Sequence, residues 1–229
     1  MDVTKGVRGG SAAIIALLLV LSAPAADPPA KPKETWKSLF DGKSIAGWKT
    51  ADFRGGGKAE VKDGAIVIEK GSTMSGIAYT GGDFPKVDYE VSFEGKRIAG
   101  GDFFCTTIFP VDSDFCSFVA GGWGGTIVGL SNVNSENASA NVTTKHKEFD
   151  NEKWYRFRLR VTKDRIRTWI GDDQVVDVDT TENRIGLHGA CEPCKPFGFA
   201  TWKTTGAVRA IRVRPLTDAE KKPADEKDK

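Results

Sequence analysis

The stretch Val87-Asp-Tyr-Glu-Val-Ser-Phe-Glu94 decides the fold class, because apolar and polar residues alternate along it without a break. Successive side chains of a β-strand point to opposite faces, so this pattern predicts a strand with one buried and one solvated face. The stretch Tyr155-Arg-Phe-Arg-Leu-Arg-Val161 alternates in the same way. No segment after residue 25 keeps a 3.6-residue period, so we expect no core built from helices.

Ten further short runs have β-strand character, and turn residues such as Asp63-Gly64 and Gly171-Asp-Asp173 separate some of them. We predict strands at 59–62, 65–70, 103–109, 115–120, 125–130, 165–170, 174–178, 184–188, 196–202 and 206–214. Many short strands with glycine-rich turns predict an all-β domain of two packed antiparallel sheets. The chain has 229 residues, 39% of them hydrophobic, which is enough to build one such domain.

The N-terminus has the composition of an export signal. Residues 1–25 combine the basic Lys5 and Arg8 with an uncharged apolar run at 12–21 and the small residues Ala23-Pro-Ala25, which predicts a cleaved signal peptide. The alternative is an uncleaved anchor, but the apolar run is only about half as long as a spanning helix. We therefore expect an exported protein, periplasmic or extracellular, with no membrane span after cleavage.

Polar segments flank the predicted domain. We interpret residues 26–34 as a proline-rich linker and residues 217–229 as a charged, disordered tail, which leaves 35–216 as the folded domain. The formal net charge of the chain is +2, so the basic surface that nucleic acids require is missing and we expect no nucleic-acid partner. We expect no cofactor, and the oligomeric state stays open.

The four cysteines form two close pairs, Cys105 with Cys116 and Cys191 with Cys194. Export favours oxidised thiols. We therefore expect two local disulfides, although three connectivities are possible in principle. The spacing also permits a metal site built from His188, Cys191 and Cys194. That set lacks a fourth ligand, so we expect no metal.

Two motifs at the ends of the domain carry a resemblance to a known family. Ser38-Leu-Phe-Asp-Gly-Lys-Ser-Ile-Ala-Gly-Trp-Lys49 opens the domain, and Lys195-Pro-Phe-Gly-Phe-Ala-Thr-Trp-Lys-Thr-Thr-Gly-Ala-Val-Arg-Ala-Ile-Arg-Val-Arg214 closes it. With these motifs the chain resembles the 3-keto-disaccharide hydrolase domain family over residues 36–216. The resemblance implies a concanavalin-A-like jelly-roll fold, shared with lectins and glucanases, in a family abundant in exported bacterial proteins, those of planctomycetes among them.

The resemblance also implies a reaction. The family cleaves a glycosidic bond in a sugar oxidised at carbon 3: a base removes the acidified hydrogen at carbon 2, the enolate expels the anomeric group, and water adds back. Such a reaction needs a base that works near neutral pH and donors or cations around the enolate oxygen. The chain departs from the family at Ala99-Gly-Gly-Asp-Phe-Phe104 and at Ile185-Gly-Leu-His-Gly189, so the fold transfers more safely than the catalysis.

Three titratable residues are the candidates for catalysis: Glu94, Asp102 and His188. Histidine changes its protonation near neutral pH, which suits a base. The alternative for His188 is a side chain hydrogen-bonded to the backbone at a strand end. Glu94 and Asp102, with the neighbouring Lys96 and Arg97, form either an acid–base set with adjoining cations or a surface ion-pair cluster.

Aromatic side chains are the first candidates for substrate binding. Trp123 lies in Gly121-Gly-Trp-Gly-Gly125, where small neighbours leave the indole clear of the chain, and Trp202 precedes Lys-Thr-Thr. Indoles stack on the apolar faces of sugars while the N–H bonds a hydroxyl. We therefore predict that both indoles bind a sugar. The alternative is that they are buried in the core.

Polar side chains complete the predicted binding set: Asn132 and Asn134 from a polar loop, together with Lys96 and Arg97. The other histidine, His146, lies between two lysines and is interpreted as a surface residue. The row of alternating arginines at 156–160 permits an anion site, but a solvated face with cross-strand charge partners is the common case in such sheets.

We therefore expect an exported carbohydrate-active protein with an oligosaccharide or glycoside as substrate, a hydrolase of the 3-keto-glycoside type. The alternatives are a non-catalytic carbohydrate-binding module and a structural or adhesion protein with neither property. The geometric test is whether the predicted residues converge on one concave cleft: Glu94, Asp102, His188, Trp123 and Trp202.

Overall fold

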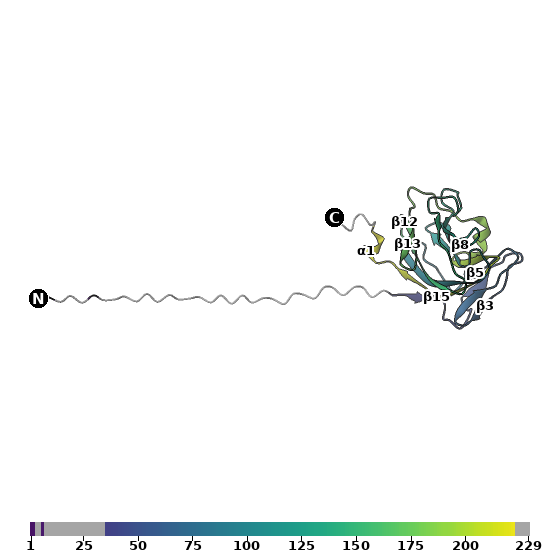
Figure 1. Ribbon diagram of the computed structural model, residues 1–229, viewed down its shortest axis with the longest axis horizontal. Coiled ribbons are helices and arrows are strands. Elements are labelled where there is room, and N and C mark those ends of the chain that lie inside the picture. The colour runs from purple at the N-terminus through teal and green to yellow at the C-terminus, as the bar shows by residue number, and fades with distance from the viewer. Residues whose placement is uncertain (3–5, 7–34, 223–229) are drawn as a thin grey trace. The chain divides into compact units, whose positions relative to one another are not determined.

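Two antiparallel β-sheets packed face to face make up most of the described chain, which the computed structural model gives as residues 1–2, 6 and 35–222. Residues 33–229 form a unit of their own, and both sheets lie within it (Figure 1). The predicted all-β fold of two sheets is therefore confirmed. The predicted signal peptide and linker, residues 1–34, lie outside the described residues except for 1–2 and 6, so export stays a prediction.

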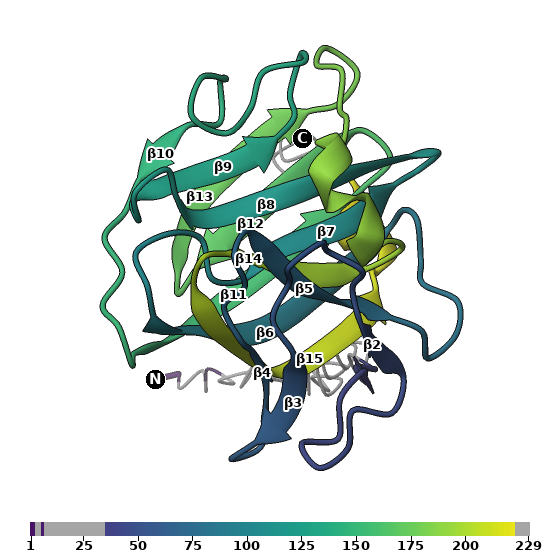
Figure 2. The same cartoon turned by 90° about the vertical axis from the view of Figure 1, so that its right-hand side faces the viewer.

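The first sheet has eight strands: β1 (Lys37–Ser38), β3 (Ala59–Lys62), β4 (Ala65–Ile68), β6 (Tyr89–Ala99), β11 (Trp154–Val161), β12 (Arg165–Ile170), β13 (Asp173–Asp179) and β15 (Thr205–Pro215). Their order is β13-β12-β11-β6-β15-β4-β3, and β1 pairs with β15. The second sheet has seven strands: β2 (Trp48–Thr50), β5 (Met74–Tyr79), β7 (Thr106–Val111), β8 (Asp114–Gly122), β9 (Ile127–Ser131), β10 (Lys145–His146) and β14 (Gly198–Trp202). Its order is β10-β9-β8-β7-β14-β5-β2, and Figure 2 looks onto this sheet.

Side chains that face inward from both sheets form one large apolar core. In β6 these are Tyr89, Val91 and Phe93, so the alternation read from this stretch is confirmed on its buried side. The buried Tyr89 hydroxyl donates to Pro110 O of β7 at 2.7 Å. This hydrogen bond satisfies the phenol inside the core and joins the two sheets.

Strand β5, which the alternation pattern does not predict, is buried along its whole length. One of its faces packs in the core, and the other contacts η1 (Gly189–Cys194), a 3₁₀-helix that lies in front of the second sheet in Figure 2. A strand covered on both faces has no need of polar–apolar alternation, so its sequence gives no period-two signal. The opposite error occurs at residues 184–188, predicted as a strand. Ile185 makes a single bridge to Val133 there, because this segment runs into η1.

The folded part of the chain extends beyond the predicted boundary at residue 216. A short helix, α1 (Asp218–Lys221), follows Thr217, whose N–H donates to Glu220 Oε2 at 3.0 Å. Glu220 pairs with Arg160 and Arg214 of the first sheet. The predicted disordered tail therefore does not begin at residue 217, because an acidic side chain just beyond the boundary reaches back to two arginines of the sandwich.

Candidate functional site

A small cavity opens on the outer face of the second sheet, beside η1. Its volume is about 210 Å³. Buried side chains of β5, β7, β8 and β9 form its floor, and η1 and the loops that hold Phe103, Trp123 and Asn137 contribute to its rim. The cavity is lined by Met74, Phe103, Thr106, Ser117, Val119, Trp123, Ser131, Asn137, His188, Ala190, Cys191 and Trp202. Three of the predicted site residues, Trp123, His188 and Trp202, therefore meet at one place.

Trp123 stands in a tight turn that follows β8. Its φ of 48° lies in the left-handed region that bulky residues avoid, and Gly121 and Gly124 on either side also have positive φ. The indole is 49% exposed, as the glycine-rich setting predicts. An exposed, conformationally fixed indole at the rim of a cavity is suited to stacking on a sugar ring.

Asp102 fixes the turn that carries Trp123. Its Oδ1 accepts the Phe103 N–H at 2.8 Å, and its Oδ2 accepts the Gly124 N–H at 3.1 Å. Its own N–H donates to Thr204 Oγ1 at 3.1 Å. Asp102 does not line the cavity. The geometry therefore gives this residue a positioning role in place of the predicted acid–base role.

Trp202 lies at the end of β14 and is 36% exposed. The backbone N–H of Trp202 donates to Phe103 O at 3.1 Å, and Phe103 is part of the cavity wall. The adjacent residues Asp102 and Phe103 thus position both indoles. This link explains how two tryptophans that are distant in sequence reach the same rim.

His188 lies at the rim, where it caps η1. Its Nδ1 accepts the Ala190 N–H at 3.2 Å, and its carbonyl accepts the Cys191 N–H at 2.8 Å. The side chain is exposed. A neutral imidazole that accepts a hydrogen bond at Nδ1 carries its proton on Nε2. The backbone contact considered as the alternative is therefore present at one ring nitrogen, and Nε2 is the nitrogen left for a ligand.

One hydroxyl in the floor has no hydrogen-bond partner. Thr106 is 1% exposed, and its Oγ1 is buried and unpartnered among the described residues. The floor serines are different, because Ser117 Oγ donates to Ser131 O at 2.8 Å and Ser131 Oγ donates to Asn132 Oδ1 at 3.0 Å. A buried polar group without a partner costs about 1–3 kcal/mol. Thr106 Oγ1 is therefore the floor atom that would gain most from a hydrogen bond to a ligand.

Asn137 also lines the cavity. Its Oδ1 accepts the Ser139 N–H at 2.9 Å and the Ser139 hydroxyl at 2.7 Å. These two bonds fix the amide plane and occupy its oxygen. The Nδ2 group, which makes no hydrogen bond among the described residues, remains as a donor for a ligand.

The cavity lining determines what chemistry is possible. The described residues that line it include no Asp or Glu, so the two-carboxylate route of ordinary glycosidases has no residue pair here. Burial raises the pKa of the Cys191 thiol to about 11, which keeps it protonated and unreactive near neutral pH. His188 is therefore the one lining side chain suited to proton transfer near neutral pH.

Two predicted residues lie on the opposite sheet. Glu94 of β6 pairs with Arg209 of β15, with 2.6 Å between Oε2 and Nε. Lys96 pairs with Glu152, with 2.7 Å between Nζ and Oε2. Both belong to the first sheet, so the prediction that they share a site with His188 is wrong. Strand alternation shows that a side chain faces outward, but not which of the two outer faces it occupies.

Arg97 is a buried structural residue and not a ligand-binding cation. Its Nε donates to Asn151 Oδ1 at 2.7 Å, its Nη2 donates to Phe149 O, and the guanidinium lies 5.8 Å from the centroid of the Phe104 ring. It is 8% exposed. The predicted substrate-binding role is corrected, since these contacts hold the loop before β11 against the core.

The two predicted asparagines also lie apart from the cavity. Asn134 donates to Asn183 Oδ1 at 2.9 Å and accepts the Arg184 N–H at 2.9 Å, so it joins two loops. Asn132 lines a separate polar cavity of about 550 Å³ at the end of the sandwich. The polar loop was correctly placed near the site, but its contributing residue is Asn137.

All four cysteines are buried free thiols, so neither predicted disulfide is present. For Cys105 and Cys116 the strand register gives the reason. Cys116 pairs with Phe109 in the β7–β8 ladder, which aligns Cys105 with Ala120. The two cysteines are thus displaced by about 13 Å along the strands. A disulfide requires Cα atoms roughly 4.4–6.8 Å apart.

The metal set considered from spacing does not form either. No group of three or more His, Cys, Asp or Glu side chains within the described ranges is arranged to hold a metal ion. In those same ranges no helix has the length and apolar character needed to cross a membrane.

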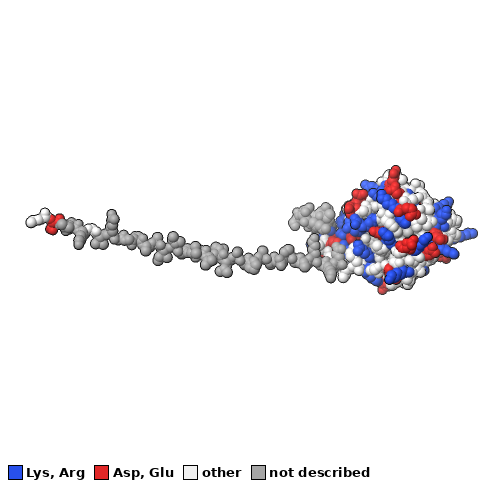
Figure 3. Space-filling model, turned by 60° about the horizontal axis from the view of Figure 1, so that its bottom comes forward, with Lys and Arg blue, Asp and Glu red and all other residues white. Residues whose placement is uncertain are grey.

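The arginine row of β11, predicted as a solvated face with charge partners, is solvated over only part of its length. Arg156 pairs with Asp172 at 2.6 Å, and Arg165 of β12 pairs with Asp177 at 2.5 Å. On the face seen in Figure 3, Lys and Arg are interspersed with Asp and Glu. On this face the charges are therefore mixed and do not form a surface of a single sign.

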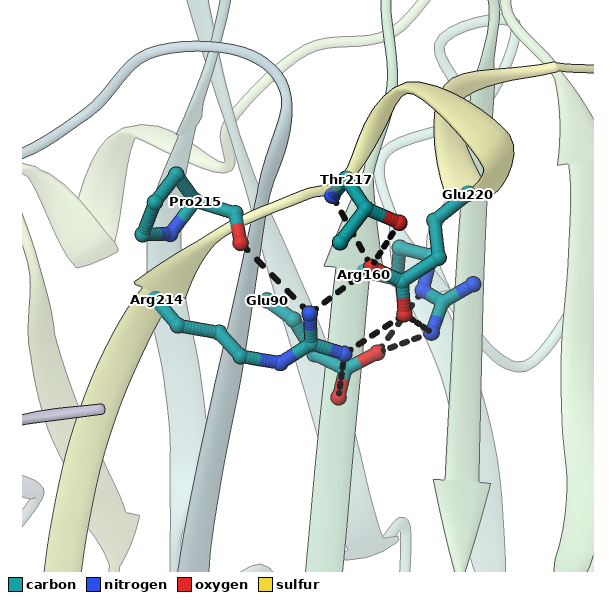
Figure 4. Close-up of polar contacts among 6 residues, drawn as sticks. All are labelled: Glu90, Arg160, Arg214, Pro215, Thr217 and Glu220. Carbon is teal, nitrogen blue, oxygen red and sulfur yellow. Dashed lines mark hydrogen bonds and ion pairs between the residues drawn. The ribbon is translucent and has the colours of Figure 1, made fainter. Parts of the chain in front are cut away.

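One part of the outer face of the first sheet is not solvated. Glu90 is 2% exposed and receives Arg160 at 2.6 Å and Arg214 at 3.1 Å (Figure 4). Glu220 of α1 joins them, with Arg214 Nη1 and Nη2 donating to its two oxygens at 2.8 and 2.7 Å. Chiefly because of this Arg214 contact, the pKa of Glu220 is well below its ordinary value. We call these four residues the buried ion network: Glu90, Arg160, Arg214 and Glu220.

Sequence reasoning missed the residues that form the cavity floor. Thr106, Ser117 and Val119 occupy outward positions on strands that are otherwise buried. For Thr106 and Ser117 the only signal is a hydroxyl residue at an outward position of an apolar strand, and Val119 carries no signal. That signal becomes specific once the strand order places β7 beside β8.

Comparison with known proteins identifies the domain. Residues 35–214 match the family described as the 3-keto-alpha-glucoside-1,2-lyase-like domain. No curated protein matches the chain. The match covers both sheets and every residue that lines the cavity.

Several solved structures share the concanavalin-A-like sandwich. The carbohydrate-binding module CBM66 of Bacillus subtilis is 16% identical, with a TM-score of 0.51, and the match covers 73% of this chain and 95% of that one. A lichenase derived from a mouse hindgut metagenome is 11% identical, with a TM-score of 0.51 and coverages of 80% and 99%. The apo Crh5 transglycosylase is 11% identical, with a TM-score of 0.53 and coverages of 82% and 85%. These likenesses show the fold, which binding modules and enzymes share.

Proposed function

Because the chain belongs to the 3-keto-alpha-glucoside-1,2-lyase-like domain family, we propose that it is an exported enzyme that cleaves the glycosidic bond of 3-keto-glycosides in the cavity beside η1. One observation carries this proposal: two exposed indoles and a histidine meet over a floor with an unpartnered hydroxyl. The indoles hold the sugar, and the histidine supplies the proton transfer that the reaction needs.

His188 removes the proton from carbon 2 of the sugar. To act through Nε2 the exposed ring exchanges its proton with solvent and takes the other tautomer, which gives up the Ala190 contact at a cost of about 1 kcal/mol. The electron pair of the C–H bond passes to the oxygen at carbon 3. Asn137 Nδ2 donates to that oxygen as its charge develops.

The enolate then collapses and breaks the bond between carbon 1 and the leaving group. The imidazolium of His188, or solvent, returns a proton to the departing oxygen. Water adds across the resulting double bond between carbons 1 and 2, which completes a net hydrolysis. No step uses a carboxylate, in keeping with a lining that contains none among the described residues.

The experiment uses two chromogenic glucosides that differ only at carbon 3, one with a ketone and one with a hydroxyl. We expect the purified protein to release the aglycone from the ketone alone, because only the ketone acidifies the hydrogen at carbon 2. Release from neither glucoside, or equal release from both, would contradict the proposal.

The second candidate function is a non-catalytic carbohydrate-binding module. The absence of a carboxylate among the described lining residues favours it, since indoles and amides alone are enough to bind a sugar. Binding of the unoxidised and oxidised glucosides with no turnover of either would select this function.

The positioning role of Asp102 yields a prediction for ligand affinity. We expect Asp102→Ala to raise the Kd for the 3-keto-glucoside about tenfold, because two hydrogen bonds to a charged group no longer fix the Trp123 turn. Titration followed by tryptophan fluorescence measures the change. Asp83→Ala, at an exposed position outside the cavity lining, is the control and should bind like the parent protein. Equal affinities of the two variants would refute the positioning role.

A further inference from the structure

A trough with a volume of about 690 Å³ crosses the outer face of the first sheet, the opposite face of the sandwich from the cavity beside η1. Five residues in direct register form its central row: Trp154 of β11, Lys96 of β6, Ala207 of β15, Val67 of β4 and Glu60 of β3. Neighbouring strands lie about 4.8 Å apart, so the row spans roughly 19 Å. The trough is therefore long enough for several sugar rings in a line.

Small side chains give the trough its depth. Ala65, Val67 and Ala207 lie on adjacent strands, and longer side chains rise on both sides of them. Ala65 and Ala207, which line the floor, are 3% and 1% exposed. The volume falls within the roughly 300–1,000 Å³ that is typical of ligand sites.

Trp154 is held in a fixed orientation at one end of the row. The Arg209 guanidinium carbon lies 4.0 Å from the ring centroid, and Lys96 Nζ lies 5.2 Å from it. Both cations are tethered in turn, Arg209 by Glu94 at 2.6 Å and Lys96 by Glu152 at 2.7 Å. The indole is half-buried, so part of its surface remains open to the trough. A pre-oriented indole loses little entropy when a ring stacks on it.

The charges around the trough are balanced. Four cationic and four carboxylate side chains line it. Those at the β3–β4 end, Glu60, Lys62, Glu69 and Lys70, make no ion pair among the described residues, so their polar atoms are available. A surface with equal donors and acceptors and no net charge matches the hydroxyl groups of a neutral sugar. It does not attract a polyanion.

We propose that this trough is a second binding site, for a neutral oligosaccharide chain. One ring stacks on Trp154, and the free carboxylates and ammonium groups at the β3–β4 end bond the hydroxyls of the rings beyond it. The site is independent of the reaction at His188, because the two lie on opposite faces of the sandwich.

The test compares two tryptophans of the same sheet. Trp169 of β12 also has an arginine carbon, that of Arg158, 4.0 Å from its ring centroid, but it does not line the trough. We expect Trp154→Ala to weaken binding to neutral polysaccharides in affinity gel electrophoresis about tenfold, and Trp169→Ala to leave it unchanged. Both variants should cleave the small 3-keto-glucoside at the parental rate, if the proposed reaction holds. Binding therefore fails or succeeds separately from turnover.

A second pair of variants tests whether a loss of binding has a cause other than misfolding. Lys62→Ala removes an exposed lysine of the trough, and Lys49→Ala removes an exposed lysine of the other sheet. We expect only the first to weaken polysaccharide binding, with thermal unfolding of both unchanged. The proposal is overturned if Trp154→Ala and Trp169→Ala bind alike, if no neutral polysaccharide retards the parent protein, or if sulfated polysaccharides retard it more than neutral ones.

Discussion

In His188→Ala the release of aglycone from a 3-keto-glucoside should fall by about 10²- to 10⁴-fold, because proton transfer by a positioned base contributes on that scale. The cavity has no other lining side chain suited to replace it among the described residues: its floor is apolar apart from hydroxyls, and the Cys191 pKa is about 11. Initial rates measured with the chromogenic ketone give the ratio directly.

Binding separates a chemical role from a structural one. Trp123 and Trp202 remain in place in the variant, so the Kd for the ketone, from tryptophan fluorescence, should change by less than about threefold. His146→Ala is the matched control, since it removes the other histidine, an exposed residue of β10 that does not line the cavity. The assignment fails if the two variants keep equal rates, or if His188→Ala loses binding in parallel with turnover.

In Glu90→Ala the free energy of unfolding should fall by about 3–5 kcal/mol, because Arg160 and Arg214 then lie buried with one carboxylate between them. Denaturant titration measures the loss. Arg156→Ala is the control: its side chain and that of its partner Asp172 are 59% and 96% exposed, so less than about 1 kcal/mol should be lost. A loss below 1 kcal/mol for Glu90→Ala would show that the buried ion network contributes little.

The pH dependence of the same network follows from Glu220. Its pKa is lowered in the folded protein from the ordinary value of 4.5, mainly by Arg214. A group with a lowered folded-state pKa stabilises the fold above its unfolded pKa and loses that contribution as the pH falls through the folded value. Glu220→Gln should therefore be less stable than the parent at pH 7, and the difference should shrink as the pH falls below about 4. A difference that is constant between pH 7 and pH 3 would contradict this.

The strands that could be predicted from sequence are those with one face in the core and one outside. Residues 87–94 and 155–161 alternate because their outward side chains carry charge, and both stretches form strands in the first sheet. Residues 74–79 could not be predicted in this way, because η1 covers their outer face and removes the need for polar residues there. The packing of η1 against the second sheet thus explains both why β5 could not be predicted and why a cavity floor lies beside η1.

The site could be predicted only in part, for a related reason. Trp123, Trp202 and His188 carry local signals, an unusual glycine setting or a rare residue type, and they meet at the cavity. Glu94 and Lys96 carry equally good local signals, but their strand belongs to the other sheet. The pairing of strands that are distant in sequence decides between such cases, and a single sequence contains no direct measure of it.

The position of β15 affects how the chain matures. This strand lies between β6 and β4 and also pairs with β1, so without it the first sheet separates into β13-β12-β11-β6, β4-β3 and an unpaired β1. Most of its contacts join residues more than a hundred positions apart in sequence. The first sheet therefore cannot close before β15 has been synthesised, more than a hundred residues after β6, and strand pairing over such a separation is slow.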